Sequence, residues 1–458
     1  MLSNRAYKLI NDFIIITFTD TIIENFNTNK ICHLGMQRGN IMNKHASVLL
    51  TVIFFTALSA SAVSYTLQIF GNANMDEIID DADISYLEKV IKGEADNTKF
   101  SDANNDGTVD EKDIDQVQNI IDGTEEILVV FDDTARSVEI PEPVKSFVYH
   151  GHNSYVYETV RAIGVSDRII GITDRFVTPG GNRYSKTYFP ELLSNVESVG
   201  ELQTVNYEVV NNLNPDVVLT DAREYYDHTK TPDTPVIALD VNITNSKEAA
   251  MRYGYIFGKV SEAKEYVDWS TEIENMISEK IKDIPESERP LAYFSGYDLD
   301  RTKFSVPGTD SYRAVMIKNA GGRYMGDEIK GTGSQSVDAE WVIARNPDVI
   351  FFSAGNSVLG YDIYSPKNAT EAIDEFLKRP EFADVEAVKN KQVYMISHPY
   401  ILCGGASGLI GSLYYAKWLY PDLFKDIDVQ EVHQEFVSKF QHLDLDVNKC
   451  ISAYPLPE

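Results

Sequence analysis

Apolar and polar positions change their spacing along this chain, and the change divides it into parts. From about residue 125 onward, short apolar runs typical of buried strands alternate with segments in which apolar residues recur at helical spacing. Strands that are apolar on both faces suit a parallel sheet covered by helices. Such runs lie at residues 146–149, 169–172, 217–219 and 236–239, and again at 291–294, 349–352 and 393–396. The pattern predicts an α/β fold with two doubly wound parallel sheets.

Two further elements accompany these strands. Residues 127–130 and 138–141 alternate as a β-hairpin does, with a turn at 132–135 between them. After residue 246, charged and apolar residues interleave at helical spacing to about residue 282. We predict one long helix there, of about 25 residues and roughly 38 Å. Such a helix is long enough to join two lobes.

A motif occurs twice in the chain, with its first glutamates 132 positions apart. In each copy a short amphipathic helix should end at Asn-Pro, because proline cannot continue the helical hydrogen bonds and moves the preceding residue out of the α region. An apolar strand follows directly. Two copies indicate two similar lobes that face one another and hold a ligand between them. The copies are Glu208-x-Val210-x-x-x-Asn214-Pro215-Asp216-Val217 and Glu340-x-Val342-x-x-x-Asn346-Pro347-Asp348-Val349.

Charge narrows the range of partners. The chain has 458 residues, enough for two or three domains, and its net charge of −29 argues against nucleic acid, whose phosphates it would repel. Residues 71–126 contain 17 acidic and 4 basic residues, so much of the negative charge is local. No nucleophile–base pair and no pair of catalytic carboxylates is evident, so we do not expect an enzyme.

The acidic stretch contains two loops with the spacing of a calcium-binding loop, in which oxygens at positions 1, 3, 5, 7, 9 and 12 surround the ion. The second loop has Gly107 at position 6, where the chain turns sharply, whereas the first has Glu77 there and asparagine at position 1. We expect calcium in the second loop and leave open whether the first is filled. The predicted ligands are Asp102, Asn104, Asp106, Thr108, Asp110 and Asp113 in the second loop, and Asn72, Asn74, Asp76, Ile78, Asp80 and Asp83 in the first.

Each loop precedes a short helical pattern that closes at a glycine, Gly93 or Gly123. Aspartate at position 12, together with two loop–helix repeats, makes residues 71–124 resemble a type I dockerin. The resemblance implies a small all-α module that binds calcium and docks onto a cohesin-bearing protein. The alternative is a calcium-stabilised spacer without a partner.

The N-terminal part carries an export signal. Residues 42–62 have the basic start, apolar middle and small-residue end of a secretory signal peptide, so we expect a secreted or cell-surface protein. Residues 1–62 then comprise an upstream extension and the signal peptide, which is either cleaved or kept as an anchor. The three cysteines, Cys32, Cys403 and Cys450, are too few for a disulfide scaffold. A Cys403–Cys450 bridge and two free thiols both remain open.

Three blocks of sequence carry a second resemblance. They are "VVFDDTARSVEIPEPVKSFV", "VGELQTVNYEVVNNLNPDVVL" and "EWVIARNPDVIFF", and their order with the long helix resembles the substrate-binding proteins of ABC importers for iron-siderophores, haem and cobalamin. This family joins its two lobes by one rigid helix. The resemblance implies that Glu208 and Glu340 dock onto the two halves of the permease. The alternative is that both are helix N-terminal residues favoured by the helix dipole.

Ligand contacts should come from loops after the carboxyl ends of the strands. Tyrosine and arginine suit a flat or anionic chelate, because one stacks on it and the other pairs with carboxylate or phosphate. The candidates in the first lobe are His150, His152, Tyr155, Asp174, Arg175, Asp221, Arg223 and Tyr225. Those in the second lobe are Tyr297, Arg301, Ser353, Asn356, His398 and Tyr400.

Two alternatives concern these loops. His150, His152 and His398 could ligate a transition metal, or they could bond to loop backbone. The glycine-rich residues 403–408 could present backbone amides to an anion, although we interpret them as a packing turn.

The sequence thus predicts an exported binding protein that captures a metal chelate and delivers it to an ABC importer. One rival is a cohesin-tethered surface protein without a transport role, and another is a metalloenzyme built on the three histidines. The predicted parts are 1–62, the module 71–124, an N-terminal lobe 125–245, a linking helix 246–285 and a C-terminal lobe 286–458.

Overall fold

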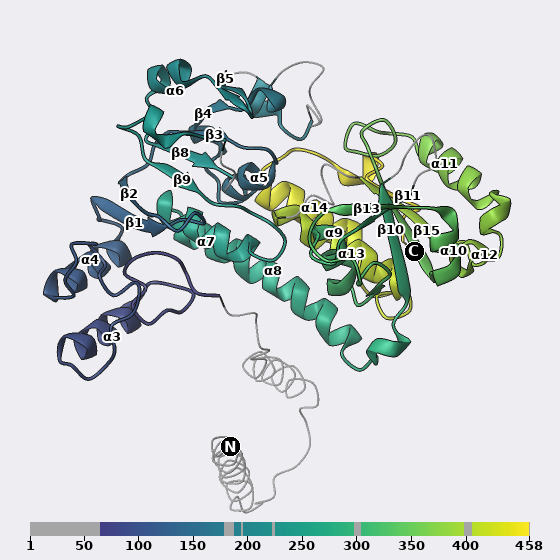
Figure 1. The fold of residues 1–458 in the computed structure, drawn as a ribbon, viewed down its shortest axis with the longest axis horizontal. Coiled ribbons are helices and arrows are strands. Elements are labelled where there is room, and N and C mark those ends of the chain that lie inside the picture. The colour runs from purple at the N-terminus through teal and green to yellow at the C-terminus, as the bar shows by residue number, and fades with distance from the viewer. Residues whose placement is uncertain are drawn as a thin grey trace, which may run out of the picture. The chain divides into compact units, whose positions relative to one another are not determined.

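The computed structural model describes residues 65–177, 187–193, 196–221, 225–296, 304–397 and 405–457 (Figure 1). The predicted signal peptide, Cys32 and Cys403 lie outside these residues. Cys450 is a buried free thiol whose Sγ donates to the Val447 carbonyl at 3.3 Å. Across the described ranges, every helix is too short or too polar to cross a membrane.

The two predicted loop–helix repeats are present. The first loop leads into α3 (Asp81–Ile91) and the second into α4 (Glu111–Asp122). The two helices begin alike, because Asp80 and Asp110 are the N-caps and each forms a reciprocal capping box with an aspartate three residues later. Gly123 ends α4 in the left-handed conformation, at φ +65°. Below, residues 65–124 are called the N-terminal module.

The predicted hairpin follows the N-terminal module and pairs with it. Strands β1 (Ile127–Phe131) and β2 (Ser137–Pro141) are antiparallel, and Ile69 forms a bridge with Val130 on the free edge of β1. The backbone N–H of Phe70 donates to Val129 at 3.0 Å, and that of Phe131 donates to Gln68 at 3.0 Å. The start of the N-terminal module therefore extends this small sheet by a further strand.

The first lobe contains a parallel five-stranded sheet in the order β5-β4-β3-β8-β9. In chain order this is 3-2-1-4-5, a doubly wound arrangement. Successive residues face opposite layers: Phe147 and Tyr149 belong to the main buried cluster, and Val148 belongs to a separate cluster with Val210 of α6. The elements are β3 (Phe147–His150), β4 (Ile169–Ile172), β5 (Glu197–Ser198), β8 (Val217–Thr220), β9 (Val236–Ala238), α5 (Tyr155–Ala162) and α6 (Tyr207–Leu213), with a small hairpin of β6 (Gly200–Glu201) and β7 (Thr204–Val205).

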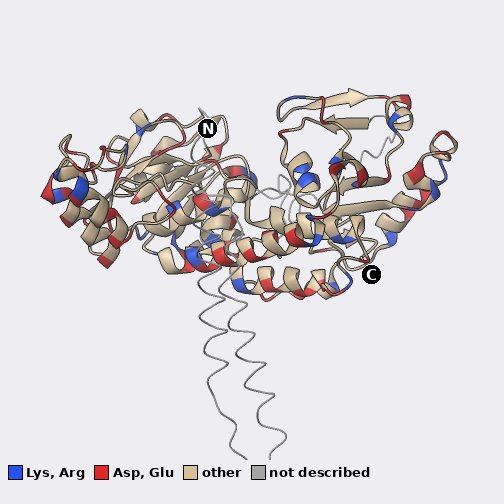
Figure 2. Ribbon diagram, turned by 90° about the horizontal axis from the view of Figure 1, so that it is seen from below, with Lys and Arg blue, Asp and Glu red and all other residues tan. Residues whose placement is uncertain are grey.

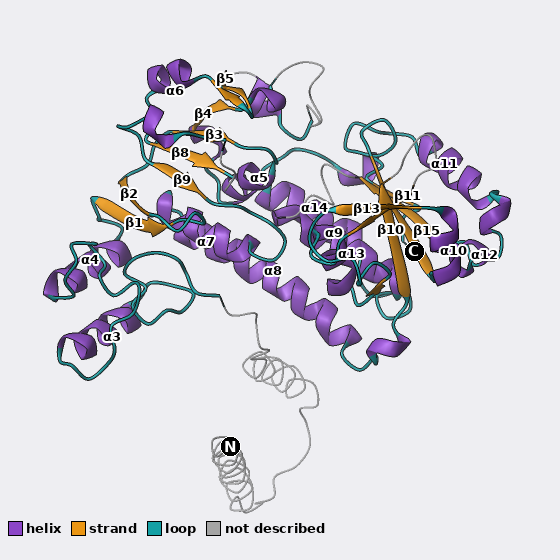
Figure 3. Cartoon of the chain, in the orientation of Figure 1, coloured by secondary structure: helices purple, strands orange, loops and turns teal. Residues whose placement is uncertain are grey.

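The second lobe has its own five-stranded sheet, β12-β10-β14-β15-β16, in which only the edge strand β16 is antiparallel (Figure 3). Its two faces are covered: Phe351 stacks on Tyr415 of α13 at 4.2 Å, and the next residue, Phe352, contacts Phe376 of α11 at 5.0 Å. The strands are β10 (Leu291–Gly296), β12 (Arg323–Tyr324), β14 (Val349–Ala354), β15 (Val393–Ser397) and β16 (Ala453–Tyr454), beside a hairpin of β11 (Phe304–Pro307) and β13 (Ser334–Val337). The helices are α9 (Tyr312–Asn319), α10 (Ala339–Arg345), α11 (Lys367–Leu377), α12 (Glu386–Lys389), α13 (Gly408–Leu419), α14 (Val429–Glu435) and the π-helical turn η8 (Phe436–Phe440).

The repeated motif has the same structure in both lobes. Helices α6 and α10 end at Asn214 and Asn346, which adopt left-handed conformations at φ 48° and 46°. Proline follows each asparagine, which explains why the helices stop there. The motif aspartate then anchors the neighbouring strand: Asp216 accepts the backbone N–H of Ser146 at 2.8 Å, and Asp348 accepts that of Leu291 at 2.7 Å.

The predicted single linking helix is two helices, α7 (Ser246–Ile256) and α8 (Val260–Ile281). Gly258 turns the chain between them at φ +61°, a conformation that residues with a Cβ rarely adopt. The helices pack tightly at the turn, because a Cβ on Gly254 would lie 2.6 Å from that of Ala263. Helix α8 alone runs from the first lobe to the second, with acidic and basic residues interleaved along it (Figure 2).

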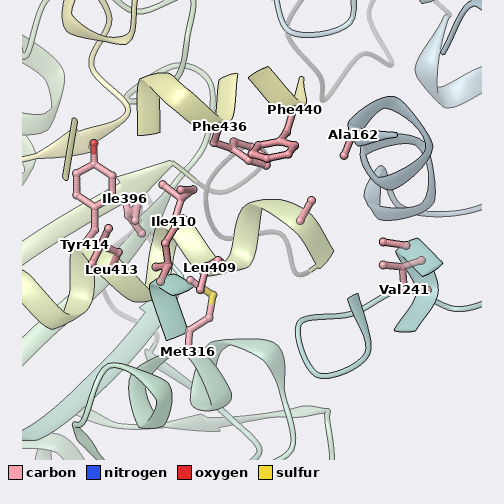
Figure 4. Packing of buried hydrophobic residues seen from close by; sticks show 14 of the residues in the cluster. Ala162, Val241, Met316, Ile396, Leu409, Ile410, Leu413, Tyr414, Phe436 and Phe440 are labelled. Carbon is pink, nitrogen blue, oxygen red and sulfur yellow. The ribbon is translucent and has the colours of Figure 1, made fainter. Parts of the chain in front are cut away.

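Hydrophobic packing is continuous from the N-terminal module through both lobes, since one buried cluster contains Leu87, Tyr149 and Phe351. The π-helical turn packs on α8, where Phe436 stacks on Trp269 at 5.9 Å and Phe440 contacts the same ring at a tilt at 4.8 Å. Figure 4 shows these two rings beside α5 of the first lobe. The described residues therefore pack as one body rather than as separate domains on linkers.

Candidate ligand-binding site

Polar residues gather at the carboxyl ends of the first-lobe strands. The backbone N–H of His152 donates to buried Asp221 at 2.6 Å, and an Arg175 N–H donates to His152 Nδ1 at 2.5 Å. Because Nδ1 accepts this bond, the imidazole proton is on Nε2. Arg175 and His152 are both half-buried. Together they present hydrogen-bond donors, of which one is permanently charged.

His150 has a different environment from His152. It is 1% exposed, its ring lies 5.6 Å from Tyr226, and its Nε2 is 3.4 Å from the Glu201 carbonyl. Burial lowers its pKa, so the ring is neutral. The structure thus brings His152 to the site and packs His150 inside the first lobe, in line with the backbone-bonded alternative for that residue.

The remaining first-lobe candidates differ in how they are held. Asp174 begins a short 3₁₀ turn, and its Oδ1 is buried without a hydrogen-bond partner. Tyr155 begins α5, and its ring contacts Tyr312 of α9 edge to face at 6.5 Å. This contact links the two lobes. Tyr225 is 40% exposed.

In the second lobe, the structure adds Arg313, which the sequence analysis missed. It follows Tyr312 in the first turn of α9, and its guanidinium lies over the rings of Tyr312 and Phe294, at 4.3 and 5.7 Å. Within the described ranges it forms no ion pair, so its charge is available to a ligand. The available signal was Ser311, a residue type that favours helix N-caps and that accepts the Ala314 N–H at the start of α9.

Of the other second-lobe candidates, Ser353 lies in β14 and is 9% exposed, and Asn356 is exposed in the loop that follows. The candidates Arg223, Tyr297, Arg301, His398 and Tyr400 lie outside the described residues. Among the residues that are described, there is no group of three or more His, Cys, Asp or Glu side chains that could hold a metal ion.

A second contact joins the lobes on the other side of α5. Arg161 is fully buried, and its Nε and Nη2 donate to Gln441 Oε1 of the second lobe at 2.9 and 2.7 Å. Its Nη1 pairs with Glu191 at 3.1 Å. On the same helix, Ser154 donates to buried Glu158, whose pKa is raised to about 7 by burial. The lobes are therefore connected by the buried Arg161–Gln441 contact as well as by α8.

A cavity of about 520 Å³ lies against α8, but it is not formed by the predicted ligand residues. Its lining includes Tyr65, Lys247, Glu274 and Ser412. Lys247 and Glu274 pair with one another at 2.5 Å, which neutralises both. This cavity is thus distinct from the site built on Arg175 and His152.

Glu208 and Glu340 occupy matching places in the two lobes. Each is the second residue of its motif helix, one turn from an N-cap, Asn206 or Asp338, that accepts a backbone N–H. Both carboxylates are exposed, and within the described ranges neither forms an ion pair or hydrogen bond with the rest of the chain. The positions suit docking and are also favoured by the helix dipole.

Comparison with known proteins places this fold. The sequence profile described as "Periplasmic binding protein" matches residues 152–400, which is more than half of the chain. The chain is 23% identical over 340 residues to the molybdate-binding protein MolA of Haemophilus influenzae, covering 68% of this chain and 90% of that protein. It is 25% identical over 289 residues to the petrobactin-binding protein YclQ of Bacillus subtilis, covering 61% and 84%.

A solved structure has the same fold. The TroA-like periplasmic binding protein FepB from Veillonella parvula superimposes with a TM-score of 0.59 at 22% identity, covering 71% of this chain and 98% of that one. The predicted resemblance to substrate-binding proteins is confirmed. The chain therefore belongs to the periplasmic binding protein family, and it is a substrate-binding protein of the ABC-transporter kind and not an enzyme.

Proposed function

We propose that this protein captures a metal chelate of the ferric siderophore, haem or cobalamin type outside the cell and delivers it to an ABC importer. The observation that carries the proposal is the Arg175–His152 pair at the strand ends of the first lobe. Petrobactin binding by one relative agrees with a chelate, and molybdate binding by another agrees with an anion.

The chemistry of the site favours an anionic ligand. In a chain of net charge −29, Arg175 and Arg313 are two guanidinium groups on opposite lobes. Arg313 lies over Tyr312, which contacts Tyr155 of the first lobe. Guanidinium groups pair with carboxylate, catecholate or oxyanion oxygens through parallel hydrogen bonds, and tyrosine rings stack on flat ligands.

Ligand capture is tested by native mass spectrometry of the purified protein after incubation with ferric siderophores, haem, cobalamin and molybdate. We expect one retained chelate, and at least a tenfold weaker affinity in Arg175→Ala. Arg345→Ala is the matched control, because Arg345 pairs with Glu328 on an exposed surface. If the protein retained only molybdate, the proposed ligand would be a bare oxyanion and not a chelate. If it retained none of these ligands, the proposal would be contradicted.

Delivery is tested separately from binding. The double variant Glu208→Gln, Glu340→Gln should bind ligand as well as the native protein does, because both side chains are exposed and, among the described residues, neither contacts the Arg175–His152 pair. It should lose uptake in cells, since the carboxylates would no longer pair with arginines of the permease. Unchanged uptake would favour the alternative of a tethered surface protein without a transport role.

For the N-terminal module we propose calcium binding and dockerin-like docking onto a cohesin-bearing protein. The sequence of the second loop supports this proposal, because Asp102, Asp106, Asp110 and Asp113 would supply carboxylates, Asn104 an amide oxygen and Thr108 a carbonyl. Their carboxylates accept only backbone N–H groups and an exposed lysine, Lys112 at 3.5 Å from Asp106. In the described residues these carboxylates are not gathered into a metal-holding group, so the loop would have to close around the ion. Calcium-dependent capture of a purified cohesin, abolished by chelator, tests the docking role.

A further inference from the structure

The two loops of the N-terminal module are near copies, thirty residues apart. In each, the aspartate at position 12 accepts the backbone N–H of positions 3 and 9: Asp83 from Asn74 and Asp80, and Asp113 from Asn104 and Asp110. In each, the N–H of position 5 donates to the side-chain oxygens of positions 1 and 3. Because the two loops share these hydrogen bonds, the second loop can serve as the reference for any difference in the first.

The loops differ in the side chain at position 1 and in the hydrogen bonds that the side chains at positions 1 and 3 donate. In the first loop, Asn72 Nδ2 donates to the carbonyls of Leu67 and Asp76, both at 2.8 Å. Asn74 Nδ2 donates to Asp76 Oδ2 at 2.7 Å. In the second loop the residue at position 1 is Asp102, which has no amide and accepts the N–H of Gly107 at 2.9 Å. An amide hydrogen thus satisfies Asp76 Oδ2, an oxygen that a cation would otherwise satisfy, while the amide of Asn72 is held against two backbone carbonyls.

Asn72 cannot easily turn its oxygen toward an ion. The residue is fully buried, its Oδ1 accepts the N–H of Asp76, and its Nδ2 serves two carbonyls. A flipped amide would set oxygen against two carbonyl oxygens and nitrogen against an N–H, all away from water. The first loop also has fewer charges to attract calcium, with three carboxylates at its ligand positions against four in the second.

The first loop also contacts the body of the receptor. At its position 8, the backbone N–H of Ile79 donates to Tyr255 Oη at 2.8 Å, and Tyr255 Oη is 3.4 Å from the Ile79 carbonyl. Both residues are 4% exposed, and Tyr255 belongs to α7, the helix that leads into α8. The matching residue of the second loop, Val109, is only partly buried.

We infer that the first loop holds no metal and serves as the joint that fixes the N-terminal module to the linking helices, leaving the second loop as the single calcium site. This rests on the proposed calcium role of the second loop. The sequence pattern predicts two calcium sites of unequal affinity. The side-chain hydrogen bonds instead favour a first loop that attaches the module and a second loop that remains available for calcium.

Calcium stoichiometry tests the inference, by titration calorimetry on the whole protein after treatment with chelator. We expect one ion per chain, and none in Asp102→Asn, Asp106→Asn. The variant Asn72→Asp, Asn74→Asp removes the amide donors and should bind two. Two ions in the native protein, one ion that survives the second-loop substitutions, or no gain in the first-loop variant would overturn the inference. No ion in the native protein would contradict the second-loop proposal and still agree with a metal-free first loop.

The joint is tested by hydrogen exchange. Tyr255→Phe removes the hydroxyl that serves Ile79, so peptides covering residues 72–83 should exchange at least fivefold faster. Tyr253→Phe is the matched control, because Tyr253 is buried on the same helix but its hydroxyl reaches Leu239 at 3.4 Å. Equal exchange in the two variants would show that Tyr255 does not hold the loop.

Discussion

The two lobes share a motif but differ in the sheets that carry it. The first sheet has the order 3-2-1-4-5 and the second 2-1-3-4-5, numbered along the chain within each lobe. In both, the motif helix precedes the strand next to the first one, β8 beside β3 and β14 beside β10. The part of each lobe that the motif builds is therefore kept alike, although the strands around it are connected differently.

The ligand-facing sides of the lobes differ more. The first lobe has a hydrogen-bonded chain of Asp221, His152 and Arg175, whereas the second has Arg313 held by aromatic rings alone. A fixed chain of polar groups sets orientation, and a guanidinium held only by ring faces can adjust to its ligand. The lobes are therefore alike around the motif helices and different at the strand ends.

The largest expected effect concerns the Arg161–Gln441 contact between the lobes. Arg161→Ala should lower the free energy of unfolding by about 3–5 kcal/mol, because it leaves Gln441 Oε1 and the Tyr188 carbonyl buried without their donor. Chemical denaturation measures this. The exposed pair Lys264–Asp268 provides the control, since Lys264→Ala should cost about 0–1 kcal/mol. If the two variants lost similar amounts of unfolding free energy, the Arg161–Gln441 contact would not hold the lobes together.

The next effect is a pH dependence that arises from Glu158 in the first lobe. The folded pKa of Glu158, about 7, is above its ordinary value of 4.5, so its contribution to stability is complete below pH 4.5 and is lost as pH rises through 7. Glu158→Gln should remove a slope of at most about 1.4 kcal/mol per pH unit in that window. Helix α9 of the second lobe has no acidic residue.

Denaturation of the native protein and of this variant at pH 4.5, 6 and 8 would measure the difference. The stability gap between them should change across the series in favour of the variant at high pH. A gap that stays constant with pH would show that Glu158 does not titrate in this range.

The smallest effect compares the two motif copies directly. Asp216 accepts from Lys145 N, Ser146 N and Ser146 Oγ, whereas Asp348 accepts from Leu291 N. We expect Asp216→Ala to cost about 2 kcal/mol and Asp348→Ala about 1 kcal/mol. Parallel denaturation curves give both values. Equal costs would show that the copies support their sheets equally.

Much of the fold was predictable because its signals are local. Apolar runs located the main strands, and Asn-Pro located the ends of α6 and α10. The break at Gly258 also had a local signal, a glycine of the kind that ends helices, but the continuing mixture of charged and apolar residues obscured it. Two-residue strands such as β5 and β12 have too few residues to show any alternation.

The rest depended on contacts between distant residues. Arg161 and Gln441 are 280 positions apart, and neither carries a pattern that indicates the other. The same holds for Arg313, which reaches the site because Ser311 starts α9 beside the end of β10. His150 ends β3 and packs inside the lobe, whereas His152 lies in the loop that follows and contacts Arg175, so the sequence named both where the fold uses one.

The pairing of the N-terminal module with β1 has a mechanical consequence. A protein held at its N-terminal end would carry any pulling force through the bonds from Phe70 to Val129 and from Phe131 to Gln68, with Tyr255 as a further attachment. Parallel bonds share a load and yield together, whereas a flexible linker would simply extend. The receptor would therefore keep its orientation under tension from its attachment point.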